Sequence, residues 1–439
     1  MKLAIVTPFV QRSAIGRVNA AVADQLAARG HEVQIIRSES VDDPQAPLHP
    51  TSLPCRHWSK VDLAALARQV DLAIVNVGDN YLFHGGIFPV LEQVPSLGVF
   101  HDFYIYNLFS GWLFDKQLDW KVHDGEIEAV YGPQALDAAR AARSGELDMG
   151  GIAKVIPMTE WVARRCAGAL SHADFYRERL EAVCAGPVGM IPLCGPARPG
   201  GPAPARKRKE LVVLTLGVMN ANKCVAEVIQ AIAASDTLKD SVRYRLVGAI
   251  LDSERERLTA LADELGFTGL SIEGAVDDDA FEAAMADADI ITCLRRPVLE
   301  GASGSVIDGM LSGRPTIVCD AGFYGEQPDD LVCKIKPEVD VAELTATLER
   351  LAADPAARRK MGEKARAYAL DALGPQRYAE GLEAAARETI DALPLLAVGQ
   401  RMGWRLAQLG IDRDHPGTDR LSAALTRLFA TAAEPQTAI

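Results

Sequence analysis

Apolar segments of strand length alternate with amphipathic segments of helix length along most of the chain. In the first half, helical spacing of apolar residues at 16–29 and near 60–69 separates segments that have the composition of strands. Those strand-like segments are 2–9, 32–38, 71–78, 97–103, 153–159 and 188–193. Because strands that alternate with helices usually pair in parallel, this pattern predicts a doubly wound α/β domain.

A segment rich in Pro, Gly and Ala, "CGPARPGGPAPAR", interrupts the alternation and predicts an exposed linker. The alternation then restarts, with strand-like segments at 210–217, 244–249, 270–274, 289–294 and 315–320, and helical patterns at 221–234, 252–265, 278–287 and 303–312. Beyond residue 341 nearly every pattern is helical, including a final amphipathic segment at 419–432. We therefore expect two Rossmann-like domains that face a ligand cleft at the carboxyl ends of their strands.

These patterns divide the chain into four parts. They are a first domain at 1–193, a linker at 194–209, a second domain at 210–372 and C-terminal helices at 373–439. We expect part of the C-terminal helices to pack on the first domain.

The composition narrows the class of protein. A net charge of −13 argues against broad electrostatic attraction to nucleic acid or anionic lipid. Eight scattered cysteines without a CxxC pair are typical of a reduced, cytoplasmic protein. The N-terminal apolar segment is too short for a signal peptide, and the chain has no run of eighteen apolar residues. We therefore expect a cytoplasmic enzyme, and peripheral contact with the inner face of the membrane stays open.

The stretch "LRRPVLEGASGSVIDGMLSGRPTIVCD", residues 294–320, combines charged and small residues between two apolar runs. Arg295 follows a predicted buried strand, and small residues precede a predicted helix. A helix that begins this way presents free N–H groups and a positive dipole end, which suit a phosphate. Asp308 lies one turn into that helix, near the place of a ribose. The stretch predicts a nucleoside diphosphate site, although Glu300 and Asp308 are also compatible with ordinary helix-start charges.

This stretch resembles the donor-site signature of the retaining glycosyltransferases of family 4, which have the two-domain GT-B fold. The signature places two glutamates with seven residues between them, and Glu300 and Asp308 occupy these positions. The match continues to Gly322, Glu326 and Pro328. Asp308 departs from the signature, because its side chain is one methylene shorter than glutamate. The resemblance implies that Glu300 binds sugar hydroxyls and that Asp308 contacts the ribose.

The resemblance also implies a set of residues around the nucleotide sugar. Lys223 corresponds to a lysine that pairs with the diphosphate, although an ordinary surface lysine also fits that position, and Val218 stands where many members carry an arginine. Asn220 is a suitable N-cap for the next helix. The expected nucleotide-sugar site comprises Gly16, Asn220, Lys223, Arg295, Glu300, Gly301, Ala302, Ser303, Gly304, Ser305 and Asp308.

In the first domain, "GVFHDFYIYNLF" places His101 and Asp102 at the end of an apolar strand. A histidine there is often a packed residue, but the family has a functional histidine at this spot. The resemblance therefore implies the catalytic set His101, Glu300, Lys223 and Arg295. Weaker candidates for the acceptor side are Asn80, His84 and Asp102.

The chemistry implied is transfer of a sugar with retention of configuration, in which the departing phosphate takes the acceptor's proton. No cofactor and no metal are expected, since a helix N-terminus and cations can stabilise the leaving diphosphate. The expected partners are a UDP- or GDP-sugar and a saccharide or lipid-linked acceptor, and no nucleic acid. A nucleotide-sugar epimerase of the same fold and a non-catalytic partner of a glycosyltransferase are the alternatives. The lack of GxGxxG after either first strand disfavours a dinucleotide dehydrogenase.

Overall fold

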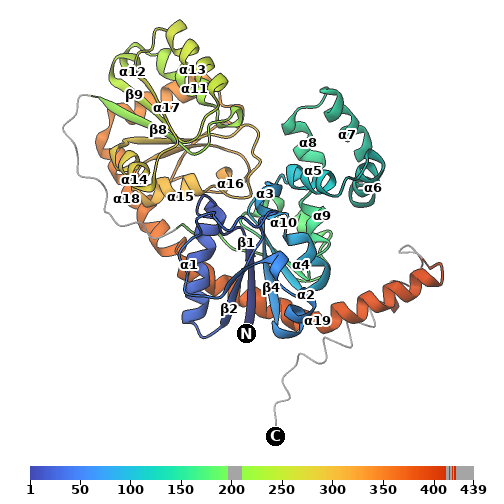
Figure 1. Cartoon of the computed structure of the whole chain (residues 1–439). Coiled ribbons are helices and arrows are strands. Elements are labelled where there is room, and N and C mark those ends of the chain that lie inside the picture. The colour runs from blue at the N-terminus through green and yellow to red at the C-terminus, as the bar shows by residue number, and fades with distance from the viewer. Residues whose placement is uncertain (196–209, 412–414, 416–417, 419, 422–439) are drawn as a thin grey trace.

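The computed structural model describes residues 1–195, 210–411, 415, 418, 420 and 421. Two domains, each built on its own parallel sheet, lie side by side, and a long C-terminal helix runs along the first (Figure 1). The predicted fold of two doubly wound domains with a helical tail is confirmed. Most of the predicted linker and almost all of the predicted helix at 419–432 lie outside the described residues.

The first sheet has seven parallel strands in the order β3-β2-β1-β4-β5-β6-β7. Its central strands are buried because helices cover both faces, which is why they read as continuous apolar runs. The strands are β1 (Lys2–Thr7), β2 (Glu32–Arg37), β3 (Cys55–His57), β4 (Leu72–Val77), β5 (Ser96–Phe100), β6 (Gly168–Ser171) and β7 (Val188–Met190). The sequence patterns did not indicate β3 and β6, which are short.

Helices connect these strands and carry the chain across the sheet. The first, α1 (Ala14–Ala28), begins at Ser13, whose hydroxyl accepts a hydrogen bond from the Gly16 amide at 3.0 Å, and it buries Val22 and Leu26. The others before β5 are η1 (Trp58–Lys60), α2 (Leu63–Gln69), α3 (Tyr81–His84) and α4 (Ile87–Gln93).

A helical segment that the sequence patterns did not indicate stands between β5 and β6. It extends beside the second domain (Figure 1), and contacts such as that of Phe109 with Trp161, whose ring centroids are 4.9 Å apart, hold it together. Its members are α5 (Tyr106–Asp115), α6 (Trp120–Tyr131), α7 (Ala135–Ser144), α8 (Met149–Val155) and α9 (Thr159–Ala163). The strand predicted at 153–159 is wrong. These residues instead form the end of α8, a turn at Met158 with φ +69° and the start of α9. The prediction failed because a short apolar run fits a buried helix as well as a strand.

The second sheet has six parallel strands in the order β10-β9-β8-β11-β12-β13. They are β8 (Leu211–Leu216), β9 (Val242–Val247), β10 (Leu270–Gly274), β11 (Ile290–Cys293), β12 (Thr316–Cys319) and β13 (Cys333–Ile335). The helices around them are η3 (Ala221–Lys223), α11 (Val225–Ala233), α12 (Asp236–Ser241), α13 (Asp252–Glu264), α14 (Asp278–Asp287), α15 (Gly304–Leu311), α16 (Gly322–Gly325), α17 (Val341–Ala353) and α18 (Pro355–Ala372). Between β6 and β7 the first domain adds η2 (Asp174–Tyr176) and α10 (Arg177–Glu181).

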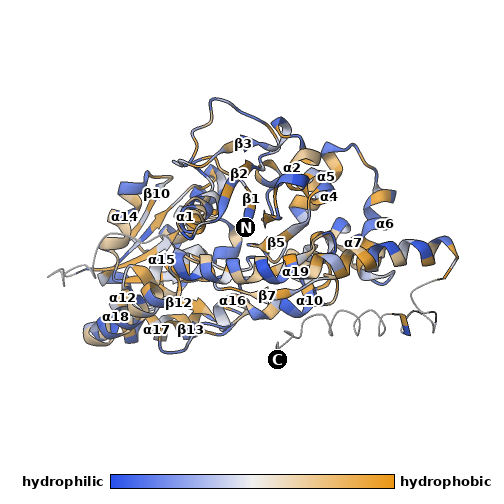
Figure 2. Ribbon diagram, turned by 90° about the horizontal axis from the view of Figure 1, so that it is seen from below, coloured by the Kyte–Doolittle hydropathy of each residue, from blue (hydrophilic) through white to orange (hydrophobic). Residues whose placement is uncertain are grey.

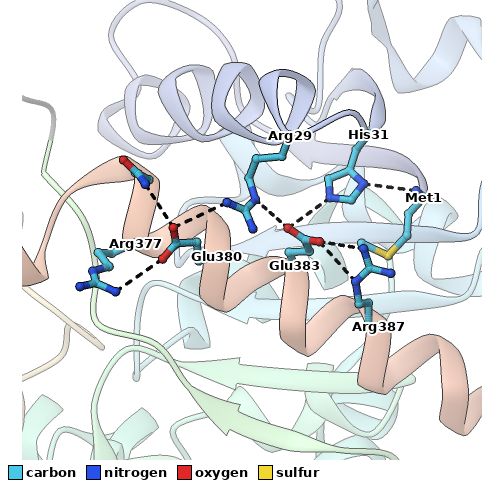
Figure 3. A network of polar contacts seen from close by, with 8 residues as sticks. Met1, Arg29, His31, Arg377, Glu380, Glu383 and Arg387 are labelled. Atoms are coloured by element: carbon cyan, nitrogen blue, oxygen red, sulfur yellow. Dashed lines mark hydrogen bonds and ion pairs between the residues drawn. The ribbon is translucent and has the colours of Figure 1, made fainter.

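The last described helix, α19 (Pro375–Gln408), returns to the first domain and packs against α1. Hydrophilic and hydrophobic residues alternate along it (Figure 2). Its Glu383 binds Arg29 at 2.6 Å and lies 3.4 Å from His31, which in turn contacts the amino group of Met1 (Figure 3). The C-terminal part of the chain is therefore tied to its N-terminus. No helix in the described part of the chain is long and apolar enough to cross a membrane.

Candidate active site

The charged stretch identified in the sequence forms a loop between β11 and α15, on the side of the second sheet that faces the first domain. All four residues of β11 are buried. Arg295 follows the carboxyl end of this strand, where ligands bind in sheets of this kind. α15 buries Val306, Ile307 and Met310 against the sheet and ends before Gly313, whose φ of +71° stops the helix. The predicted helix of this stretch is confirmed.

Arg295 and Glu300 form an ion pair within this loop. Arg295 Nε donates to Glu300 Oε1 at 2.7 Å, and the arginine side chain is only 5% exposed. The guanidinium also lies 5.9 Å from the ring centroid of Tyr324. Glu300 keeps about a quarter of its side-chain surface, 26%, open to solvent. Arg296 instead turns away to the carboxylate of Glu227, so only one of the two neighbouring arginines belongs to the site.

Lys223 is buried beside this pair rather than on the surface. Its ammonium donates to the carbonyl oxygen of Leu216, at the end of β8. Burial, followed by the positive charge of Arg295, lowers the Lys223 pKa to about 7. A Cβ on Gly217, whose φ is +88°, would lie 2.9 Å from the Lys223 nitrogen. Gly217 therefore leaves the space that the lysine occupies.

Asn220 does not cap the following helix as predicted. It precedes the short 3-10 turn η3, and its side chain makes no capping hydrogen bond. The helix α11 begins only after Cys224, which has φ +54°. The physical reason is that η3 and the left-handed residue interrupt what reads in sequence as one helix.

The small residues before and in the first turn of α15 lie in two environments. Gly301, Ala302 and Ser303 are buried, whereas Gly304 is exposed and a Cβ on it would meet no atom within 4 Å. The Gly301 amide is already used, since it donates to the carbonyl oxygen of His101 at 3.0 Å. Open space is therefore found at the start of α15, around Gly304 and the half-buried Ser305, with the half-buried Asp308 one turn further on.

The loop after β5 of the first domain directly contacts the loop between β11 and α15 of the second domain, which we call the donor-side loop. The amides of Phe103 and Tyr104 donate to the carbonyl oxygen of Leu299 at 3.0 and 2.9 Å, and Asp102 and Glu300 form an isolated antiparallel bridge. Backbone contacts thus place His101 and Glu300, which the sequence assigned to different domains, next to each other.

The side chain of His101 points into the first domain. Its Nε2 donates to the Asn76 side-chain oxygen at 2.8 Å, and its Nδ1 lies 3.2 Å from Nε2 of His172. Burial, and then the neighbouring His172, holds the His101 pKa well below its usual range. His84 is also buried, its ring bonds to the Asn76 carbonyl oxygen, and burial lowers its pKa to about 4.

Asp102 and Asp79 form a pair of partly desolvated carboxyl groups. Asp102 accepts the Asp79 amide at 2.9 Å, and Asp79 accepts the Asn107 amide at 2.8 Å. Burial raises the Asp102 pKa to about 7 and the Asp79 pKa to about 6. Both groups therefore change charge near neutral pH.

These carboxyl groups border a pocket of about 1420 Å³ in the first domain. Asn80 lines it and caps α3 with its side-chain oxygen, whereas His84 lies behind its wall. Exposed apolar side chains line it as well, among them Phe114 at 88% and Leu82 at 63% exposure. The lining thus combines polar groups, with Asp102 bridged to Glu300 of the second domain, and exposed apolar side chains.

Gly16 has a packing role in this structure. A Cβ there would lie 2.3 Å from the carbonyl oxygen of Pro8 and 3.0 Å from the His49 ring. The backbone amide of Gly16, in the first turn of α1, donates a hydrogen bond to the Ser13 hydroxyl. The close approach of backbone to backbone explains why a glycine stands here, in the first turn of α1 rather than in the preceding loop.

Sequence reasoning missed Asn76, His172 and Glu326 as members of this region. Asn76 is the polar residue within the apolar run of β4, which is a weak local signal. His172 follows β6 just as His101 follows β5, but the sequence patterns do not indicate β6, so no signal pointed to His172. Glu326 had been noted only as part of the matching motif. Its carboxylate accepts the amides of Asp174 and Phe175, at 2.8 and 2.6 Å, across the two domains.

Comparisons with known proteins agree with this architecture. Residues 202–368 match the family model described as glycosyl transferases group 1. An MMP α-(1→4)-mannosyltransferase of Mycolicibacterium hassiacum is 29% identical over 161 residues, which are 36% of this chain and 38% of that enzyme. The chain is thus matched to well under half of the length of that relative.

Solved structures extend the similarity to both domains. Sucrose-phosphate synthase from Thermosynechococcus elongatus has a TM-score of 0.60 at 17% identity, covering 89% of this chain and 100% of that one. HepE from Anabaena, solved in complex with UDP and glucose, has a TM-score of 0.58 at 15% identity, covering 88% and 100%. A glycosyltransferase from Rickettsia africae has a TM-score of 0.58 at 14% identity, covering 89% and 98%. The chain has the GT-B fold.

Proposed function

We propose that this chain is a retaining glycosyltransferase that moves a sugar from a nucleoside diphosphate sugar to an acceptor hydroxyl. The observation that carries the proposal is the cluster of Lys223, Arg295 and Glu300 beyond the carboxyl ends of β8 and β11. Glu300 lies directly against the first-domain loop after β5. The match of residues 202–368 to group 1 glycosyl transferases supports it, because that range contains all three side chains.

In this proposal the second domain binds the donor. Lys223 and Arg295 neutralise the diphosphate, and the first amides of α15 donate hydrogen bonds to its oxygens near Gly304. Asp308 accepts hydrogen bonds from the ribose, and Glu300 orients sugar hydroxyls while it stays paired with Arg295. The UDP bound to HepE makes UDP the first nucleotide to test, with GDP second.

The chemistry follows from where charge develops. As the bond from the sugar to the diphosphate breaks, negative charge grows on the leaving oxygen, and buried cations stabilise it more than they stabilise the intact donor. The leaving phosphate then takes the proton of the acceptor hydroxyl, which attacks from the same face and preserves the anomeric configuration. No protein nucleophile and no metal take part in this scheme.

The pocket of the first domain is the proposed acceptor site. Its polar groups, among them Asp102 and Asn80, can hydrogen-bond the hydroxyls of a saccharide, and its exposed apolar side chains, such as Phe114, suit a lipid-linked or otherwise apolar portion. Asp102 adjoins Glu300 through the backbone bridge, so an acceptor hydroxyl held there lies beside the donor sugar.

The first test separates binding from turnover. Lys223→Ala or Arg295→Ala should weaken nucleotide affinity and transfer together, by about tenfold or more, because the diphosphate loses a charged partner in both states. His101→Ala should leave nucleotide affinity within a few fold and lower turnover by about 10²-fold. Turnover near that of the wild type would make His101 a packed strand-end residue.

The same assay distinguishes the alternatives. With donor alone, an epimerase yields an isomerised nucleotide sugar, whereas a glycosyltransferase yields slow hydrolysis to free sugar and nucleoside diphosphate. A non-catalytic partner yields neither. Mass spectrometry and chromatography of the donor after incubation decide among the three.

A second test concerns Asp308. Asp308→Asn should weaken nucleotide binding by about 1–3 kcal/mol, the loss expected for a hydrogen bond to a charged group, while Asp308→Glu should be tolerated. Calorimetric affinities for the two variants give the comparison. Equal affinity of the Asn variant and the wild type would remove the ribose assignment.

A further inference from the structure

A chain of hydrogen bonds links two histidines that follow neighbouring strands of the first sheet. His101 follows β5, His172 follows β6, and their ring centroids are 4.7 Å apart. Both rings are buried, at 5% and 2% exposure. Backbone carbonyl oxygens terminate the chain at both ends, and because a carbonyl oxygen can only accept, they fix the direction of every bond between them.

At one end the anchor is the carbonyl oxygen of Val6. The Asn76 side-chain nitrogen donates to it at 3.2 Å, so the Asn76 side-chain oxygen faces the other way. That oxygen accepts from the Asn19 side-chain nitrogen at 3.0 Å and from His101 Nε2 at 2.8 Å. His101 therefore carries a hydrogen on Nε2, and in its neutral form its Nδ1 is bare.

At the other end the anchor is the carbonyl oxygen of Ile191, which accepts from His172 Nδ1 at 2.9 Å. His172 therefore carries its hydrogen on Nδ1, and its Nε2 is bare when the ring is neutral. The two bare nitrogens, His101 Nδ1 and His172 Nε2, face each other at 3.2 Å. Two neutral rings would thus oppose two lone pairs inside the protein, whereas one added proton makes a hydrogen bond and a second has no room.

We propose that His101 and His172 bind one proton as a unit, held between these two nitrogens, and that His172 is the positioning residue that fixes the ring of His101. The proton comes from solvent and adds one positive charge to the pair. This charge lies directly behind the donor-side loop, because the His101 carbonyl oxygen accepts the Gly301 amide. The protonation itself does not depend on the proposed function, but its effect on transfer does.

The groups around the pair set the pH at which it binds the proton. Burial lowers the pKa of both rings, that of His172 to about 4, so the proton enters on acidification. The charged or titratable neighbours are His84 in α3, Asp102 on the loop after β5, Tyr176 in η2, Tyr378 and Cys194 behind His172, and Glu300 of the second domain. A protonated His84 opposes the proton, and Asp102, whose pKa is about 7, is already neutral at the acidic pH where the pair takes the proton up.

The direct test is nitrogen-15 NMR of the full chain with labelled histidine rings, followed as the pH falls. We expect His101 and His172 to respond together in one step of about one proton, as coupled groups do. Separate midpoints with one proton on each ring would overturn the proposal. This measurement needs no substitution, so it holds even where a variant fails to fold.

The test by substitution uses His172→Gln, whose side-chain amide can donate to His101 Nδ1 without adding charge. We expect the shared step to vanish, and turnover near neutral pH should fall less than in His172→Phe, because the amide still holds the ring of His101. His172→Phe, which cannot donate, should lose the step and lower turnover by about tenfold or more. His57→Gln, at a buried histidine in β3 that bonds the Glu39 carbonyl oxygen at 2.8 Å, is the control and should change neither.

The pH profile of transfer adds a readout that a purely structural role would not move. In the wild type the rate should change where the pair takes up its proton, and in His172→Gln that change should be absent. An unaltered His101 titration or an unaltered pH profile in His172→Gln would contradict the proposal. If the wild type shows the shared protonation step but no sugar transfer, only the proposed function is rejected.

Discussion

The properties of single side chains at this site come from burial rather than from unusual residue types. Lys223 sits where a surface lysine is equally compatible with the sequence, yet its ammonium is desolvated and bonded to the Leu216 carbonyl oxygen. Desolvation brings its pKa to about 7. The lysine is therefore charged below about neutral pH and largely neutral above it, and a bound diphosphate would restore the charge.

This argument predicts proton uptake on nucleotide binding. At about pH 8 the free protein holds Lys223 mostly neutral, so binding of UDP or GDP should take up a large part of one proton. At about pH 6 the lysine is already charged, and the uptake should be small. Calorimetry in buffers of different ionisation enthalpy measures the number of protons taken up. The substitution Lys223→Met should abolish this uptake. Equal uptake in the wild type and in Lys223→Met would show that another group carries the proton.

The sequence predicted some residues of the site and not others for reasons that lie in hydrogen bonding. Glu300 and Arg295 stand in a motif of fixed spacing, so local sequence was enough to pair them. Asn76 and His172 gain their importance from partners on other strands, which no local pattern reveals. Asn220 failed as a cap because the backbone turns at Cys224.

Among the elements, the C-terminal helix α19 is held against the N-terminal domain by charged side chains. Glu383 accepts hydrogen bonds from Arg387 and Arg29, and these hold its pKa at about 2. A carboxyl whose folded pKa is depressed stabilises the fold at pH values above its unfolded pKa, and this contribution is lost as the pH falls through the folded pKa. For Glu383 that window runs from about 4.5 down to about 2.

We predict that Glu383→Gln loosens α19 at neutral pH. Hydrogen exchange of its backbone amides should speed up near the substitution, by about threefold to tenfold, because two charged hydrogen bonds are weakened. The difference from the wild type should shrink as the pH approaches about 2, where Glu383 itself is protonated. The exposed Glu388 of the same helix provides the control Glu388→Gln. Identical exchange in all three proteins would show that this network does not hold the helix.

Elements differed in how well the sequence predicted them. The strands near the centre of each sheet and the helix α15 could be predicted, because long apolar runs and helical spacing are strong local signals. The strands β3, β6 and β13 have only three or four residues and were not predicted, whereas the equally short β11 and β12 lie in the apolar runs of 289–294 and 315–320. Aromatic rings of α5 contact those of α6 and α9, as Phe109 does with His123 and Trp161, and the order of residues does not display these contacts.

In the whole molecule, the two domains contact each other through backbone groups near the proposed reacting centre and through a carboxylate further away. Glu326 accepts two amides at the start of η2, and Arg17 binds Asp278 at 2.9 Å. These contacts favour the arrangement in which the loop after β5 touches the donor-side loop.

We predict that Glu326→Ala shifts the protein toward a more open arrangement. Nucleotide affinity should stay within a few fold, because the proposed nucleotide site lies in the second domain, while transfer should fall by about tenfold. Small-angle scattering with bound nucleotide should show a larger radius of gyration than the wild type. Glu256→Ala, at an exposed position of the same domain, is the control. Unchanged scattering together with unchanged transfer would show that Glu326 does not support closure.

The central claim is that the second domain binds a nucleoside diphosphate through Lys223, Arg295 and the start of α15 without a metal. Calorimetric titration of the full chain with UDP and with GDP, in the presence of a chelator, tests it most directly. The account predicts binding of one of them at a single site, with affinity unchanged by the chelator and reduced about tenfold or more in Arg295→Ala. Failure of both nucleotides to bind, or binding that the chelator abolishes or that Arg295→Ala leaves intact, would contradict it.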